Sequence, residues 1–210
     1  MIDPTPVLVE SLYWITLIAV IVSSASGVLK AGFNQFDLFG VIMIGLVTGL
    51  GGGSLRDMLL DRDVFWIKDQ MFFIASLLSA VAMFIVARKV AISPKFFLIP
   101  DAAGLATFGI AGTLVSLMVG APWLVASFMG VITGTMGGIF RDVLSNEKPV
   151  VFQSQLYATV SWGGSLLFIG LLAVHMDATV AAIVSGTGIF VARLLAIRFD
   201  LCLPRFRFKS

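Results

Sequence analysis

The sequence has very few of the residues that carry out most enzymatic and metal chemistry. Its 210 residues include one cysteine, Cys202, and one histidine, His175. A single cysteine excludes an internal disulfide and a cysteine-based metal site, and a single histidine excludes a histidine cluster. Ser54 has no base close to it in sequence, so a nucleophile and base pair is missing. We therefore expect no enzyme activity, no cofactor and no resident metal.

Charged residues are also scarce. They make up 12% of the chain, whereas ordinary soluble domains contain about 25%. Hydrophobic residues reach 59%, and the mean hydropathy is +1.03. So little polar sequence leaves no room for a separate soluble domain, and the chain is predicted to be an integral membrane protein in contact with lipid. The net charge of +2 gives no indication of a nucleic-acid partner.

Long apolar runs fill most of the chain. A helix that crosses a bilayer needs about 20 mostly apolar residues, and seven stretches fit this description. They are Val7–Val28, Leu38–Leu60, Met71–Val86, Ala102–Val119, Trp123–Leu144, Leu156–Val174 and Thr179–Ile197. The N-terminus lacks the basic segment of a signal peptide, so we expect the first stretch to remain as a span.

The basic residues predict how the chain is oriented. If the N-terminus lies outside, the segments on the inner side carry most of the Lys and Arg residues. Inner loops of membrane proteins are enriched in these residues, so the sequence favours an outer N-terminus and an inner C-terminus. The tail Arg205–Lys209 is basic and aromatic, which suits an anionic lipid surface or a plain inner tail.

One short motif occurs twice, 85 residues apart. Thr48–Leu59 reads TGLGGGSLRDML and Thr133–Leu144 reads TGTMGGIFRDVL, with seven of twelve positions identical. Spans one to three therefore correspond to spans four to six. Because three is odd, the second unit enters the membrane from the opposite side. The sequence predicts inverted repeats at 7–95 and 96–175, and a seventh helix with the basic tail at 176–210.

The glycines of the motif favour a broken helix in each repeat. Gly51, Gly52 and Gly53 are consecutive, and each costs about 1 kcal/mol relative to alanine inside a helix. A break would free the carbonyls around Thr48–Gly51 and Thr133–Met136 to bind a small cation transiently, and both threonine hydroxyls would add oxygen ligands. The alternative is that the glycines serve close helix packing.

The Arg-Asp pairs follow the glycines. Ser54 and Asp57 have the S-x-x-D form of a capping box, which would restart the first broken helix. Arg56 and Arg141 could simply neutralise Asp57 and Asp142 or sit at the membrane interface. Adjacent residues do not face each other on a helix, so we expect both arginines to reach across to other spans and order or gate a constriction. In a second hypothesis, the helix starts and these arginines hold the carboxylate of a small zwitterion such as glycine.

The doubled motif and the plan of three, three and one spans resemble the prokaryotic branch of the trimeric intracellular cation (TRIC) channels, whose members are also labelled glycine transporters. The resemblance covers essentially the whole chain. It implies a homotrimer in the cytoplasmic (inner) membrane, in which the second and fifth spans of each protomer line a pore for potassium and also sodium. The resemblance assigns the family's pore motif to these residues: Gly51, Gly52, Gly53, Arg56, Asp57, Gly137, Gly138, Arg141 and Asp142.

Two features depart from that family. Met136 occupies the place of the first glycine in the second triplet, which shortens the second break. The lysine-containing motif with which animal members bind phosphoinositide has no match, so neither that lipid nor a calcium-store role is expected. The function predicted from the sequence is a monovalent cation channel, with a transporter of a small zwitterion as the alternative.

Overall fold

The computed structural model describes residues 6–34, 36–90, 96–153 and 156–204, and the regular elements in these ranges are helices. The long helices are α1 (Pro6–Ala31), α2 (Leu38–Leu59), α4 (Gln70–Lys89), α5 (Leu98–Met118), α6 (Trp123–Leu144), α7 (Ala158–Ala173) and α8 (Ala178–Arg198). The short ones are α3 (Phe65–Lys68) and the 3₁₀ turns η1 (Gly32–Asn34) and η2 (Val150–Phe152). The predicted all-α fold is confirmed. The tail Arg205–Lys209 lies outside the described residues.

Six of the helices are long and apolar enough to cross a membrane, namely α1, α2, α4, α5, α6 and α8. Helix α7 occupies the place of the sixth predicted span, but it is a shorter apolar helix of 16 residues. An α-helix rises 1.5 Å per residue, so α7 alone is about 24 Å long, less than the roughly 30 Å of a hydrocarbon core.

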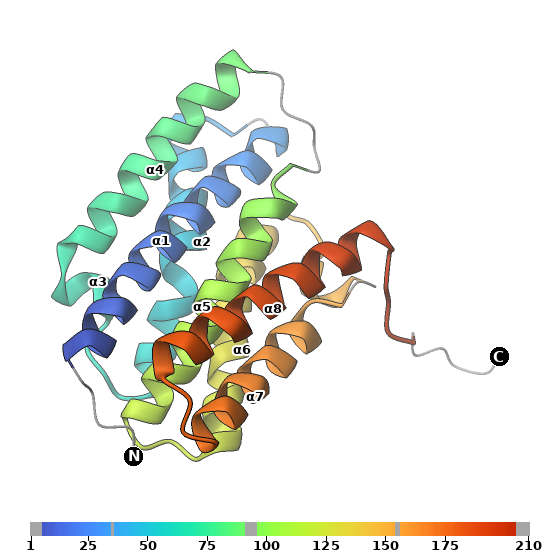
Figure 1. Cartoon of the computed structure of the whole chain (residues 1–210). Helices are drawn as coiled ribbons and strands as arrows, with labels where there is room; N and C mark the ends of the chain where they lie inside the picture. The colour runs from blue at the N-terminus through green and yellow to red at the C-terminus, as the bar shows by residue number, and fades with distance from the viewer. Residues whose placement is uncertain (1–5, 35, 91–95, 154–155, 205–210) are drawn as a thin grey trace.

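The two sets of three helices run in opposite directions. In Figure 1, α1 and α4 rise from the end of the bundle that holds the N-terminus, while α2 descends to it. Helices α5 and α7 descend and α6 rises, so each helix of the second set opposes its counterpart in the first. Helix α8 packs on α5 and α7. The arrangement is the inverted repeat with one added helix that the sequence predicts.

The chain leaves α2 and α6 through the same turn. Asp61 and Asn146, which are 85 residues apart, both have a positive φ, 52° and 55°. In each copy the backbone N–H after that residue donates to the carbonyl of the motif aspartate, at 2.9 Å from Arg62 to Asp57 and 2.8 Å in the second copy. Asp and Asn tolerate the left-handed region better than most residues, so both helix ends keep one geometry.

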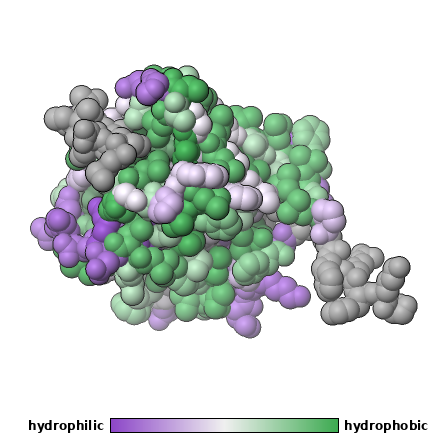
Figure 2. All heavy atoms as spheres, turned by 90° about the horizontal axis from the view of Figure 1, so that it is seen from below, coloured by the Kyte–Doolittle hydropathy of each residue, from purple (hydrophilic) through white to green (hydrophobic). Residues whose placement is uncertain are grey.

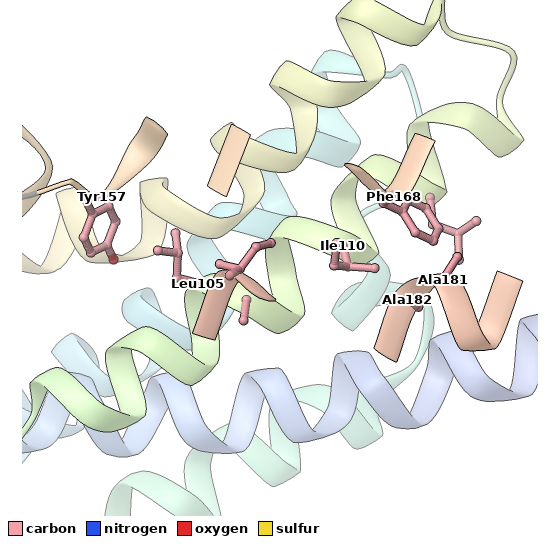
Figure 3. Close-up of a cluster of buried hydrophobic side chains, with 9 residues drawn as sticks. Leu105, Ile110, Tyr157, Phe168, Ala181 and Ala182 are labelled. Atoms are coloured by element: carbon pink, nitrogen blue, oxygen red, sulfur yellow. The ribbon is translucent and has the colours of Figure 1, made fainter. Parts of the chain in front are cut away.

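A core of apolar side chains joins α8 to the second repeat. Ile110 on α5 lies beside Phe168 on α7 and two alanines on α8, and Leu105 on α5 lies between Ile110 and Tyr157 (Figure 3). Tyr157, just before α7, lies at one end of the same cluster. These contacts hold the segment around Tyr157 in place.

The outside of the bundle is largely apolar. Phe39 and Met58 are 72% and 68% exposed, as suits side chains in contact with lipid tails. Figure 2 views the bundle from the end that holds the N-terminus, where hydrophilic residues form separate groups beside a mainly hydrophobic surface. Other polar side chains, among them Asp57 and Asp142, are buried inside the bundle.

Candidate functional site

Helices α2 and α6 cross with their backbones in contact, and one motif glycine from each helix lies at the crossing. A Cβ atom added at Gly52 would overlap the carbonyl oxygen of Thr133, and one added at Gly137 would overlap the carbonyl oxygen of Thr48. The two contacts are equivalent, because each residue is 85 positions from its counterpart. A hydrogen atom in place of a side chain is what permits this approach.

The prediction of broken helices is wrong. Helix α2 is continuous through Gly51–Gly53, and α6 is continuous through Gly137 and Gly138. The carbonyls of Thr48 and Thr133 therefore belong to regular helices, where they accept hydrogen bonds from residues four positions later, and are not freed to bind a cation. The packing alternative is correct for Gly52 and Gly137, because contact with the facing helix offsets the low helix propensity of glycine.

The remaining glycine positions of the motif have different surroundings. A Cβ atom at Gly51 would lie 2.8 Å from the Phe140 ring, and one at Gly53 would lie 2.6 Å from the Phe65 ring. Gly138 has more room, since its nearest neighbours would be 3.5 Å away or farther. Met136 is partly buried in α6. These positions are packed less tightly against backbone than Gly52 and Gly137.

Thr48 and Thr133 are buried at the crossing. Their hydroxyls donate to the carbonyls of Ile44 and Met129 on their own helices, both at 2.6 Å. Each hydroxyl oxygen retains accepting capacity. Both threonines line a cavity of about 10 Å³ together with Gly137, Gly138 and Asp101. A space of this size holds about one water molecule, so the crossing is closed to a hydrated ion.

The two Arg-Asp pairs have the same geometry. The Nε atoms of Arg56 and Arg141 donate to Oδ1 of Asp57 and Asp142, each at 2.8 Å. The other aspartate oxygen accepts a backbone N–H eight residues later, at 3.0 Å from Phe65 in the first copy and 2.9 Å in the second. All four charged side chains are buried. Each pair therefore ties the end of its helix to the following loop.

Two expectations about the first copy are wrong. Arg56 pairs with the adjacent Asp57 instead of reaching across to another span, because the guanidinium folds back along its own helix. Ser54 is inside α2 and does not cap it; its hydroxyl donates to the Leu50 carbonyl at 2.8 Å and accepts from Trp66 at 2.8 Å. The capping pattern is present in sequence, but the helix does not begin there.

Arg141 does reach other helices, as predicted. Its Nη1 atom donates to Oδ1 of Asp101 on α5 at 2.7 Å and to the Ser26 hydroxyl on α1 at 3.2 Å. The Tyr157 hydroxyl donates to the second oxygen of Asp101 at 2.9 Å, and the guanidinium of Arg193 lies 4.6 Å from the Tyr157 ring centre. We call Arg141, Asp101, Ser26 and Tyr157 the Arg141 cluster.

Sequence reasoning missed Ser26 and Tyr157 as members of this cluster. A signal was available at the offset of 85 residues, because Tyr157 aligns with Phe72 and Asp101 with Thr16. Where a polar or charged residue in one repeat aligns with an apolar or neutral residue in the other, the two repeats differ in chemistry.

The family model described as "Glycine transporter" matches residues 13–88 and 98–173, two segments that also begin 85 residues apart. The UPF0126 inner membrane protein YadS of Escherichia coli (strain K12) is 37% identical, over 92% of this chain and 95% of that protein. The UPF0126 membrane protein YvgT of Bacillus subtilis (strain 168) is 31% identical, over 93% of this chain and 96% of that protein.

A solved structure is similar over the same length. The crystal structure of the TRIC trimeric intracellular cation channel orthologue from Rhodobacter sphaeroides matches with a TM-score of 0.87 and 32% identity, covering 91% of this chain and 99% of that chain. Sequence and fold therefore agree over nearly the whole molecule. The chain belongs to the prokaryotic TRIC channel family, which is also described as the glycine transporter family.

Proposed function

We propose that this protein is a channel for monovalent cations, potassium chiefly and sodium also. The observation that carries the proposal is the similarity, at 32% identity and over 91% of the chain, to a structure of a trimeric intracellular cation channel orthologue. The closed crossing of α2 and α6 is consistent with a channel in its non-conducting state.

The proposed pathway runs between α2 and α6 past Thr48 and Thr133. Their hydroxyl oxygens are small neutral ligands, which bind a monovalent cation weakly enough for it to leave again. Helices α2 and α6 must separate at Gly52 and Gly137 for an ion to pass. The Arg-Asp pairs hold the ends of both helices and contribute to the pathway by positioning, because their charged groups are buried and paired with each other.

The assembly and placement in the membrane are part of the same proposal. We place the chain as a homotrimer in the inner membrane of a prokaryote, with a pathway in each protomer and lipid around the trimer. The similar proteins YadS and the Rhodobacter sphaeroides channel are named as an inner membrane protein and a trimeric channel. The distribution of Lys and Arg favours an outer N-terminus and an inner C-terminus.

The experiment that tests the pathway replaces each crossing threonine with valine, which has the same shape but no hydroxyl. Loss of one oxygen ligand that contributes about 1 kcal/mol weakens potassium binding about fivefold. The single-channel potassium conductance of Thr48→Val and of Thr133→Val should each fall by about that factor. The two variants should behave alike because the sites are equivalent.

Thr107→Val is the matched control. The Thr107 hydroxyl also donates to a carbonyl four residues earlier, at 2.8 Å, but it faces an apolar groove away from the crossing. Its conductance should equal that of the wild type. Unchanged conductance in both crossing variants would show that ions do not pass these threonines.

The description of the family model favours a second candidate, a secondary transporter of a small zwitterion such as glycine. Saturable uptake of labelled glycine by reconstituted protein, lost in Arg56→Ala, would support it. Passage of many ions in each opening would exclude it as the main mode, since a carrier moves only a few solutes per conformational cycle.

A further inference from the structure

The surroundings of Arg56 and Arg141 differ although the arginines are equivalent. At Arg141, Nη1 is held by Asp101 and Ser26. At the offset of 85 residues, Asp101 corresponds to Thr16 and Ser26 to Ala111. The surroundings of Arg56 therefore lack the carboxylate and the serine hydroxyl that bind Nη1 of Arg141.

The Nη1 atom of Arg56 has no hydrogen-bond partner among the residues that the structure describes, although Arg56 is only 2% exposed. Its Nε and Nη2 atoms both bind Asp57 Oδ1, each at 2.8 Å. Leaving a buried charged donor without an acceptor is costly, so a group that accepts from Nη1 would be stabilised at this position.

The space beside Arg56 is open. Arg56, Thr16 and Phe72 line a cavity of about 700 Å³ at the end of the bundle that holds the N-terminus (the end viewed in Figure 2). Phe72 corresponds to Tyr157 and has no hydroxyl to fill the region that the tyrosine occupies in the Arg141 cluster. Exposed Arg62 is also in the lining, so solutes reach the cavity from the water.

We propose that this cavity binds the carboxylate group of a small solute, with Arg56 Nη1 as its main donor. The internal repeat supplies the precedent, because a protein carboxylate, that of Asp101, occupies the equivalent position beside Arg141. Charge-assisted bonds from arginine to carboxylate are among the stronger hydrogen bonds in proteins. The lining of the site includes neither Thr48 nor Thr133, and the proposal holds whether or not the solute crosses the membrane.

The other charges of the lining are compatible with such a ligand. Lys68 and Arg62 add positive charge, and the exposed Asp61 adds negative charge. Asp63 forms an ion pair with Lys68 at 3.8 Å. Asp69 accepts the backbone N–H of Met71 at the start of α4. Arg62, in the same lining, would offset part of the charge of a second carboxylate beside Asp57.

Saturation-transfer NMR with acetate and purified protein in nanodiscs tests the proposal, with methylammonium as a probe that lacks the carboxylate. Acetate should give a saturable signal with wild-type protein, and methylammonium should give none. Thr16→Asp would place a protein carboxylate where Asp101 lies in the other repeat, so acetate affinity should fall by at least about tenfold. Thermal unfolding should show that this variant is folded.

Thr16→Asn is the matched control, because it has the same shape as the aspartate without its charge, and it should keep acetate binding. Arg56→Gln should lose binding, whereas Arg62→Gln should keep most of it. Equal acetate affinity in Thr16→Asp and wild type, or saturable binding of inorganic phosphate without any binding of acetate, would overturn the proposal. Because these measurements record binding and not current, they are independent of the channel proposal.

Discussion

The positive charges of the two buried arginines, Arg56 and Arg141, are neutralised in two different ways. Arg56 has one carboxylate partner among the described residues, Asp57, whereas Arg141 has two, Asp142 and Asp101. Removing one partner of a buried ion pair is far more damaging than removing both. The consequences of a mutation should therefore differ between equivalent positions.

We predict that Asp57→Asn destabilises the protein more than Asp142→Asn. The first change leaves Arg56 without a carboxylate and should cost about 3–5 kcal/mol, whereas Arg141 keeps its bond to Asp101 after the second. Denaturant titration of both variants in detergent, followed by circular dichroism, measures the difference. Equal losses of stability would mean that Asp101 does not support Arg141.

A second prediction at this scale concerns the crossing glycines. Gly52→Ala and Gly137→Ala should each destabilise the protein by about 1–3 kcal/mol, because the new methyl group meets backbone that has no rotamer by which to move away. Gly163→Ala on α7 is the control, since a Cβ there meets nothing within 4 Å, and it should be neutral or stabilising. Thermal unfolding in detergent checks both, and an unchanged midpoint for both crossing variants would contradict the packing account.

At the same scale, the sequence indicates which residues matter better than it indicates what they do. The paired motif pointed to Arg56, Asp57, Arg141 and Asp142, and all four are buried at equivalent places. Their partners could not be read from the motif. Helix spacing argues against contact between adjacent residues, but it does not allow for a long arginine side chain that bends to the carboxylate next to it, as in both copies.

At the level of single helices, α2 and α6 are continuous although their glycine clusters predict a break. Propensity assigns three consecutive glycines to a break, because it treats the helix as isolated. In the folded protein, Gly52 contacts backbone of α6, and Gly51 and Gly53 contact aromatic rings. Tertiary contacts keep the helix continuous, and a single sequence cannot reveal the partner helix that makes those contacts possible.

Element positions themselves could be predicted well. Runs of apolar residues predict the position of every long helix, because a span needs about 20 apolar residues and unpaired polar groups are costly in lipid. The exception is α7, which begins at Ala158 after Tyr157 turns inward to meet Asp101. Hydropathy counts Leu156 and Tyr157 as part of a span, since it does not register that a tyrosine hydroxyl is bound to a buried carboxylate.

At the scale of the whole molecule, the inverted repeat gives two ends with the same backbone plan and different chemistry. The Arg141 cluster closes one end with polar contacts from three helices, and the Arg56 end holds an open cavity. Such an arrangement makes the two sides of the membrane unequal. The orientation of the chain therefore decides whether the open cavity faces the outside or the cytoplasm.

The single cysteine provides a test of that orientation. Cys202 is exposed beyond the end of α8, and with the C-terminus inside it should resist a membrane-impermeant maleimide in intact spheroplasts and react after lysis. Asp63→Cys in a Cys202→Ser background is the matched control, and it should react before lysis because Asp63 lies in an exposed loop at the other end. The reverse pattern would show that the chain is inserted the other way.

The most direct test of cation passage is the reversal potential of purified wild-type protein in a planar bilayer with unequal potassium chloride on the two sides. We predict currents that reverse close to the potassium equilibrium potential, and similar currents when sodium replaces potassium. Currents that reverse at the chloride potential, or protein that passes no current while accumulating glycine, would contradict it.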